Sequence, residues 1–319
     1  MRNFKNILVA LREDDIAHDT VALNQAINLA DANGARLSII TIFKELPDVI
    51  KVFLSENYDI KTKEVVIEKT TEMIIEKVAK INKKVSENLG VEVAFGTPFL
   101  AIVKRVLREK HDMVIIGGTE QRSLKKRIFG STTMQLMRNC PAAVWVMNPP
   151  PSDRSEAKIL ACVDDKHGQP VAEEINHKVL SMATSIARDS KSKLHILQGW
   201  RHFGEEIQRG HWGLEGNQVD KIDKELHDKS EAALNKCVNQ HKFEGIDHEV
   251  QLLKGDAGRL ISNFVKENNI HLVVMGTVTR TGVSGFLIGN TAEKILRSLH
   301  CSVLTIKPDN WVSPVTIDD

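Results

Sequence analysis

The stretch HLVVMGTVTRTGVSGFLIGNTAEKILRSL (271–299) combines three patterns that together indicate one class of fold. It opens with a short apolar run, continues through a loop-like part at 276–290 in which most residues are glycine, small or polar, and ends with apolar residues at helical spacing. A strand, a glycine-containing loop and a helix in this order are typical of a parallel α/β sheet. The stretch therefore predicts an α/β domain that carries a loop at the carboxyl end of a strand.

The same pattern occurs earlier in the chain, because the sequence contains an internal repeat. MVIIGG (113–118) resembles LVVMGT (272–277), and VEVAFGTPF (91–99) resembles the segment that begins HEVQLLKGD at residue 248. Matching residues keep one constant offset from about residue 91 onward. A period of this length is far longer than a solenoid repeat, so each copy is expected to be a domain.

Each copy alternates short runs rich in Val and Ile with segments of helical spacing. The strands expected in the first copy are NILVAL (6–11), ARLSIITIF (35–43), VEVAF (91–95), DMVIIG (112–117) and AAVWVM (142–147). The helices expected between them cover residues 20–34, about 60–90 and 97–110. This alternation predicts an α/β fold of two tandem doubly wound, Rossmann-like domains, each an open parallel β-sheet flanked by helices.

The domain boundaries follow from the repeat and from one proline-rich segment. PPPSDRSEA (149–157) excludes both a helix and a central strand. We expect a first domain at 1–148, a linker at 149–156, and a second domain at 157–319 that ends in a short C-terminal tail.

Composition limits the class of protein. The chain has 319 residues, of which 42% are hydrophobic and 27% are charged, so it can bury two cores of ordinary size. Lys plus Arg (43) nearly balances Asp plus Glu (42), which predicts neither a nucleic-acid nor a membrane partner. The four cysteines form no C-x-x-C pair, and the first apolar run is too short for a signal peptide. We expect a cytoplasmic protein.

The loop at 276–290 has a physical reason to bind phosphate. Glycine lets the backbone approach a ligand closely, and the free N–H groups at a helix N-terminus favour an anion. The glycine spacing is neither G-x-G-x-x-G nor the P-loop pattern. It is similar to a third pattern, G-x-x-G, nine residues, then G-[ST], which is the nucleotide loop of the universal stress protein family.

The chain resembles this family over nearly its whole length, twice over, in the tandem-domain form. The resemblance implies binding of ATP, usually with Mg. It also implies an Asp just after the first strand that contacts the nucleoside, and a glycine loop with a final Ser or Thr that holds the phosphates.

In the second copy, Asp164, Gly276 and Gly289 match the family pattern, whereas Thr279 replaces the middle glycine and Asn290 replaces the final Ser or Thr. The candidate nucleotide-binding residues are Asp164, Gly276, Thr277, Thr279, Gly282, Gly289, Asn290 and Thr291. The β-branched Thr279 is expected to weaken binding, while Asn290 can still cap the helix. As an alternative, the glycines only turn the chain, and Asp164 is only a turn or capping residue.

The corresponding site in the first copy is expected to be degenerate for ATP. Gly117, Gly130 and Ser131 match the pattern, but Glu120 replaces the middle glycine and Arg12 replaces the Asp. A carboxylate that faces phosphate is repulsive unless it is neutralised. The basic run at 125–127 could neutralise it or form a solvated face.

Other chemistry finds little support in the sequence. No G-x-S-x-G, H-E-x-x-H or kinase signature occurs, so no catalytic residue is assigned. The histidines at 195, 202, 211, 227, 241 and 248 contain no H-x-x-x-H pair and are interpreted as scattered surface or core residues, with no metal ligands. Trp200 and Trp212 flank an insertion and either line a pocket or pack a helix on the sheet.

Three functional hypotheses remain. The first is a regulatory protein of the stress response that binds an adenine nucleotide in its second domain. The second is a scaffold, or a carrier of a small apolar ligand, that binds no nucleotide; the third is a weak ATPase. The resemblance also implies that AAVWVM can pair with SVLTIK (302–307) within one chain, and homodimerisation is a further alternative.

Overall fold

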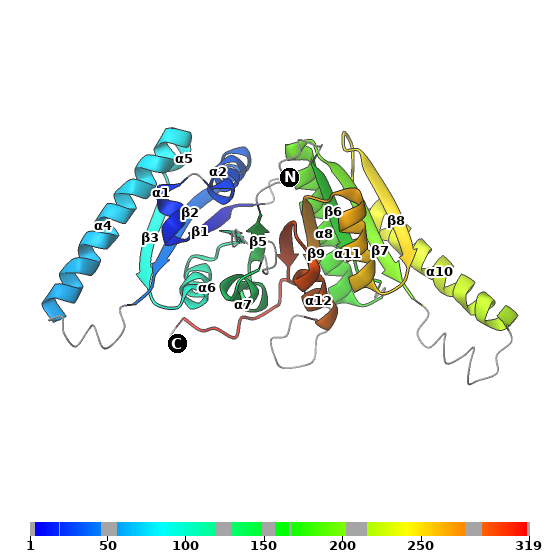
Figure 1. Cartoon of the computed structure of the whole chain (residues 1–319). Coiled ribbons are helices and arrows are strands. Elements are labelled where there is room, and N and C mark those ends of the chain that lie inside the picture. Colours follow the sequence, from blue (N-terminus) through cyan, green and yellow to red (C-terminus); the bar gives the residue numbers. More distant parts are fainter. Residues whose placement is uncertain are drawn as a thin grey trace. The chain divides into compact units, whose positions relative to one another are not determined.

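A computed structural model describes residues 4–18, 20–45, 56–118, 129–148, 157–165, 168–201, 216–277 and 289–317. The chain divides into two compact units (Figure 1). The first unit comprises Met1–Pro149 together with Trp311–Asp319, and the second comprises Pro150–Asn310.

The first unit is a doubly wound parallel sheet with the strand order β3-β2-β1-β4-β5. Its strands are β1 (Asn6–Leu11), β2 (Arg36–Phe43), β3 (Gly90–Phe95), β4 (Met113–Gly117) and β5 (Ala143–Met147). Its described helices are α1 (Glu13–Ala17), α2 (Val21–Asn33), α4 (Glu56–Ile81), α5 (Lys83–Ser86), α6 (Pro98–Glu109) and α7 (Ser131–Asn139). Contacts group α2 with α4 and α6 with α7, as right-handed crossovers require for helices on opposite faces.

The second unit repeats this topology with the strand order β10-β9-β6-β7-β8. Its strands are β6 (Lys158–Val163), β7 (Lys193–Trp200), β8 (His248–Lys254), β9 (Leu272–Gly276) and β10 (Ser302–Ile306). Its described helices are α8 (Pro170–Ser190), α10 (Gly216–Asn239), α11 (Ala257–Asn268) and α12 (Asn290–Ser298). Here α8 contacts α10, and α11 contacts α12, so the helices again cover both faces.

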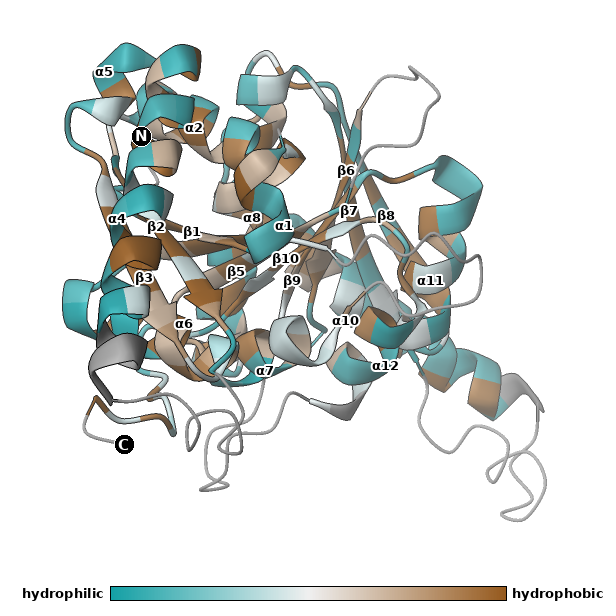
Figure 2. Cartoon of the chain, turned by 60° about the vertical axis from the view of Figure 1, so that its left-hand side comes forward, coloured by the Kyte–Doolittle hydropathy of each residue, from teal (hydrophilic) through white to brown (hydrophobic). Residues whose placement is uncertain are grey.

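The central strands are apolar on both faces because helices cover both sides of each sheet. Residues 7–11 of β1 and 159–163 of β6 are all buried. The hydropathy colouring shows brown strands behind helices whose outer surfaces are largely teal (Figure 2). The core of each unit therefore lies along its sheet. Among the described residues, no helix combines the length and apolar character needed to cross a membrane.

The expected strands agree with the structure to within one residue at each end, and the α/β fold is confirmed. The long helical segment expected at about 60–90 is broken, because the side chain of Asn82 caps a new short helix by accepting the N–H of Val85 at 3.1 Å. The short helix α1 was not expected from the sequence.

The C-terminal tail differs from the expected division of the chain. The sequence placed the tail with the second domain, whereas Trp311–Asp319 groups with the first unit. The hydroxyl of Ser313 donates a hydrogen bond to the carbonyl of Asn139 at 2.8 Å, and Val315 is buried. The tail therefore satisfies a carbonyl in the last turn of α7, which no intrahelical N–H can reach.

Candidate functional site

The candidate nucleotide site of the second unit lies where β6 and β9 end side by side. Their registered pairs run as far as Cys162 and Met275, so Asp164 follows β6 at the same edge at which Gly276 closes β9. The chain leaves β6 toward β7, whereas β9 lies on the other side of β6. This reversal of strand order is where doubly wound sheets bind ligands. The structure thus brings Asp164 and Gly276 to one edge.

The backbone of Asp164 is held by a buried amide. Its N–H donates to Oδ1 of Asn176 at 2.8 Å, and Nδ2 of Asn176 donates to the Asp164 carbonyl at 3.0 Å. Asn176 lies on α8 and is 3% exposed. Two hydrogen bonds from one buried side chain fix the chain direction at Asp164, whose side chain is half-buried.

Thr277 links the end of β9 to the start of α12. Its N–H donates to the carbonyl of Ile306 at 3.1 Å, and its own carbonyl accepts the N–H of Gly289 at 3.0 Å. Thr277 is 1% exposed, so these bonds are shielded from water. The hydrogen bond between Thr277 and Gly289 therefore holds together the two ends between which the loop runs. Thr279 and Gly282 lie outside the described residues.

The two matching glycines differ in the reason for having no side chain. A Cβ on Gly276 would lie 2.4 Å from Cγ2 of Ile175 on α8, so packing alone requires glycine there. A Cβ on Gly289 would have only the Thr277 carbonyl oxygen within 4 Å, at 3.8 Å, and its φ of −56° suits any residue. Packing among the described residues therefore explains Gly276 and leaves Gly289 unexplained.

Among the residues that the structure describes, no side chain caps the start of helix α12. Gly289 is its N-cap and has no side-chain oxygen, so the first N–H groups of the helix, from Asn290 and Thr291, receive no capping bond from it. Thr291 is exposed, whereas the side chain of Asn290 lies outside the described residues. Glu293 in the first turn is paired with Arg297 at 2.7 Å. The arrangement leaves donors that suit an anion.

The first unit organises the same edge differently. Arg12 follows β1, and its Nε and Nη2 donate to the two carboxylate oxygens of Asp15, each at 3.0 Å. The Arg12 backbone N–H also donates to Asp15 at 3.0 Å, so the carboxylate of Asp15 also binds the backbone at the start of α1. A Cβ on Gly117 would lie 3.9 Å from Nη2 of Arg12. The guanidinium thus lies beside the glycine that matches Gly276.

Gly130 and Ser131 start α7 as Gly289 and Asn290 start α12. Gly130 has ordinary extended dihedrals, and Ser131 is exposed. Glu120 and residues 125–127 lie outside the described residues, so the expected carboxylate and its basic neighbours stay predictions.

The histidines and tryptophans lie in separate places. His195 on β7 is buried, and burial lowers its pKa. Trp200 is 7% exposed between Nζ of Lys254 and the ring of His227, each 5.5 Å from its ring centroid. Trp200 therefore packs α10 on the sheet. His202, His211 and Trp212 lie outside the described residues.

The sequence analysis missed two features. Asn176 has no signature of its own, because its role depends on α8 returning over the end of β6. Four-residue spacings join Glu173 to His177 and Cys237 to His241, and this helical signal was readable but overlooked.

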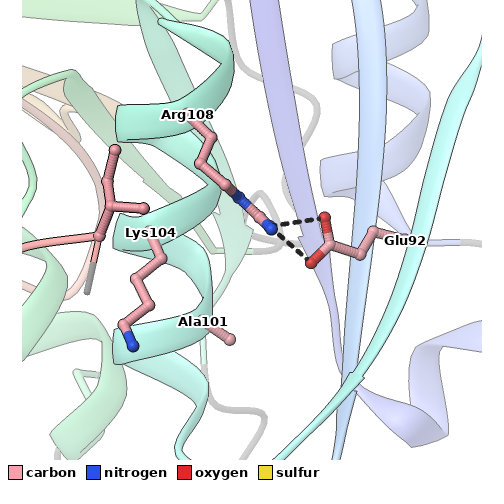
Figure 3. A pocket seen from close by; sticks show the side chains of 5 residues that line it. Glu92, Ala101, Lys104 and Arg108 are labelled. Carbon is pink, nitrogen blue, oxygen red and sulfur yellow. Dashed lines mark hydrogen bonds and ion pairs between the residues drawn. The ribbon is translucent and has the colours of Figure 1, made fainter. Parts of the chain in front are cut away.

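A shallow cavity of about 220 Å³ lies on the first unit, away from the glycine positions. It is lined by Glu92, Ala101, Lys104, Arg108 and Ile317. Nη2 of Arg108 on α6 donates to both oxygens of Glu92 on β3, at 2.9 and 3.0 Å (Figure 3). The cavity is smaller than the roughly 300 Å³ at which ligand pockets begin and has a charged lining, so it offers little to an apolar ligand.

Comparison with known proteins gives one consistent result. A family model described as the universal stress protein family matches residues 3–148 and 157–307. Universal stress protein E of Escherichia coli (strain K12) is 25% identical over 324 residues, which cover 100% of this chain and 99% of that protein. The universal stress protein E homolog of Haemophilus influenzae is 25% identical over 315 residues, covering 96% and 98%.

Solved structures share the fold over the whole chain. A functionally unknown protein from Pseudomonas aeruginosa PAO1 superimposes with a TM-score of 0.69 at 21% identity, covering 97% of this chain and 94% of that one. A universal stress protein from Archaeoglobus fulgidus gives a TM-score of 0.55 at 16% identity, covering 96% and 99%.

Proposed function

Since the chain belongs to the universal stress protein family, we propose that it is a tandem-domain regulatory protein of the stress response that binds an adenine nucleotide in its second domain. One observation carries the proposal. At a single sheet edge lie a backbone-fixed Asp164, a glycine at 289 that packing against the described residues does not require, and a helix start that no described side chain caps.

The residues present fit a nucleotide with Mg. The Asp164 carboxylate would accept hydrogen bonds from the sugar hydroxyls, and the first N–H groups of α12 would donate to phosphate oxygens. Gly289 would let a phosphate approach the backbone closely. Mg, if bound, would supply positive charge between phosphate oxygens.

The first domain is not proposed as a second nucleotide site. The Arg12 guanidinium is held by Asp15 beside Gly117, where the second unit presents Asp164 near Gly276. We propose that this guanidinium takes the place of a nucleoside contact. One nucleotide for each chain is then expected.

The primary test is calorimetric titration of the full-length protein with ATP and Mg. Asp164→Ala is expected to weaken binding about 10- to 100-fold, because a hydrogen bond to a charged group contributes roughly 1.5–3 kcal/mol. Asp165→Ala, next to it and exposed, is the matched control and should leave the affinity unchanged. Equal affinity for both variants would contradict the role of Asp164.

Native mass spectrometry of the untreated protein separates the alternatives. A co-purified nucleotide would support the proposal. An apolar molecule without nucleotide would favour the carrier, and release of phosphate from ATP would favour the weak ATPase. Action in the cytoplasm, pairing of the two copies through AAVWVM and SVLTIK, and homodimerisation remain predictions.

A further inference from the structure

Two helices on one face of the second unit bring metal-ligating side chains together, in the first turns of α8 and at the end of α10. Helices α8 and α10 both return from the carboxyl edge of the sheet, so they run in the same direction, and they contact each other. Glu173 and His177 lie four residues apart on α8. Cys237 and His241 are also four apart, at the end of α10.

Each pair lies on one side of its helix, because residues four apart on a helix are neighbours. His241 is two residues beyond the end of α10, but its N–H donates to the carbonyl of Val238 at 2.9 Å, so the helical turn continues. The side chains of Cys237 and His241 can therefore bind one ligand on the same side of α10.

The two pairs face each other at the same level along the two helices. The ring centroids of His177 and His241 are 4.6 Å apart, with the rings tilted by 48°. One turn earlier, Glu173 and Cys237 lie on the same sides of their helices as these two rings, because each is four residues before its histidine. Because the helices are parallel, carboxylate faces thiol where imidazole faces imidazole one turn on.

His241 supplies an independent observation. Its Nε2 atom is buried and has no hydrogen-bond partner among the described residues. A buried nitrogen without a partner costs free energy, and a metal ion is one of the few ligands that would satisfy it. The ring of His177 lies against this imidazole and is exposed, so it can turn toward a shared ion.

We propose that His177, Cys237 and His241, with Glu173 as a fourth ligand, bind one divalent transition-metal ion of the zinc type. Two imidazole nitrogens, one thiolate and one carboxylate oxygen form a ligand set that suits tetrahedral Zn²⁺. The thiol proton is released to solvent on binding. The site shares no residue with the proposed nucleotide site.

Binding requires side chains to rotate while the helices keep their places. Among the described residues, the three ligating groups within 4.8 Å of one another are His227, Asp228 and Glu231, also on α10. That cluster has no thiol, and its two carboxylates are exposed. It therefore serves as the control. The exposed His177 can adopt the rotamer that completes the site, and the exposed Glu173 would give up the hydrogen bond that it accepts from the N–H of Gly168 at 3.3 Å.

Cobalt is the probe, because thiolate ligation of Co²⁺ gives a sulfur-to-metal charge-transfer absorption. The full-length protein without nucleotide is expected to bind one Co²⁺ with this absorption, and Zn²⁺ should displace it. Cys237→Ser should abolish the absorption. His241→Gln should weaken Co²⁺ binding at least tenfold, since even loss of a group that only orients a ligand costs about 10- to 100-fold.

Glu231→Gln is the matched control on the same helix and should change neither the absorption nor the affinity. Zn²⁺ should raise the thermal midpoint of the parent protein but not that of Cys237→Ser. If Cys237→Ser fails to fold, His177→Gln at an exposed position provides the same comparison. No charge-transfer absorption, or one that persists in Cys237→Ser, would overturn the proposal. Because no nucleotide is present, neither result depends on the ATP site.

Discussion

The two units satisfy the same backbone group by different means. In the first unit, the N–H just after β1 donates to Asp15, three residues further along the chain. In the second unit, the N–H just after β6 donates to Asn176, which reaches back from α8. The residue between strand and helix is Arg12 in one unit and Asp164 in the other.

This difference decides the charge at the edge. A carboxylate that holds the backbone of Arg12 also binds its guanidinium, so the first unit completes an ion pair within four residues. A neutral amide that holds the backbone of Asp164 adds no charge. Local capping therefore pairs the charge of Arg12 at the first edge, whereas at the second edge the charged residue after the strand is the carboxylate of Asp164.

The largest expected effect tests the amide support. Asn176→Ala leaves both the N–H and the carbonyl of Asp164 without this partner, and should lower the free energy of unfolding by about 2–4 kcal/mol. Asn24→Ala, at an exposed position on α2 in the first unit, should change it by less than about 0.5 kcal/mol. Urea denaturation measures both. A loss in Asn176→Ala as small as that in Asn24→Ala would show that this amide does not support the second edge.

The next effect concerns a buried histidine of the first unit that has no histidine at the matching position of the second unit. His111 precedes β4, where Ile270 stands before β9, and both are buried. Burial lowers the pKa of His111 from 6.5 to about 4, and the charge of Arg105 adds to this. The unfolded state therefore binds more protons between these values, so on the order of 2 kcal/mol of stability is lost as the pH falls from 6.5 to 4.

His111→Ile should flatten this pH dependence in denaturation curves recorded between those two values. His18→Gln, at an exposed histidine of the same unit, should leave it in place. A slope that survives His111→Ile would assign the effect to other groups.

A third prediction separates packing from binding at the two glycines. Gly276→Ser should cost about 1–3 kcal/mol of stability because its Cβ would overlap Ile175. Gly289→Ser should be neutral or stabilising, since Ser is a favourable N-cap, yet it should weaken ATP binding. Thermal denaturation and calorimetry together give the answer. Loss of stability at both positions would make Gly289 a packing residue as well.

The smallest effect tests the ion pair between Arg12 and Asp15 at the sheet edge of the first unit. Arg12→Ala removes a pair in which the Arg12 side chain is 40% exposed, so it should cost less than about 1 kcal/mol, and less still at high salt. The measured number of nucleotides for each chain should stay the same. A second bound nucleotide in this variant would show that Arg12 alone closes the edge.

Much of the fold could be predicted from the sequence, because strands buried on both faces leave long apolar runs. NILVAL and ILACV are two such apolar runs, and each occurs at the same place in its copy of the repeat. The family was predicted from the glycine spacing and is confirmed. The placement of Asp164 and Gly276 at one edge follows from the reversal of strand order.

The rest depended on contacts between distant segments. The residues next to Gly276 in the sequence do not indicate its contact with Ile175, and those next to Asp164 do not indicate its hydrogen bond with Asn176. Both partners reach the site from α8. The helix breaks at Asn82 because the Asn82 side chain caps the next short helix, and this local capping residue was visible in the sequence. To predict that His177 lies against His241, one would need both the four-residue helical spacing and the knowledge that α8 contacts α10.

The tail that binds to α7 has a consequence for synthesis on the ribosome. The first unit includes Trp311–Asp319, which are translated well after Pro149. At about 5–20 residues per second, roughly 10–30 s of translation separates the two. During that interval the nascent first unit lacks the hydrogen bond from Ser313 to Asn139, so the first unit is completed only after the second has been translated.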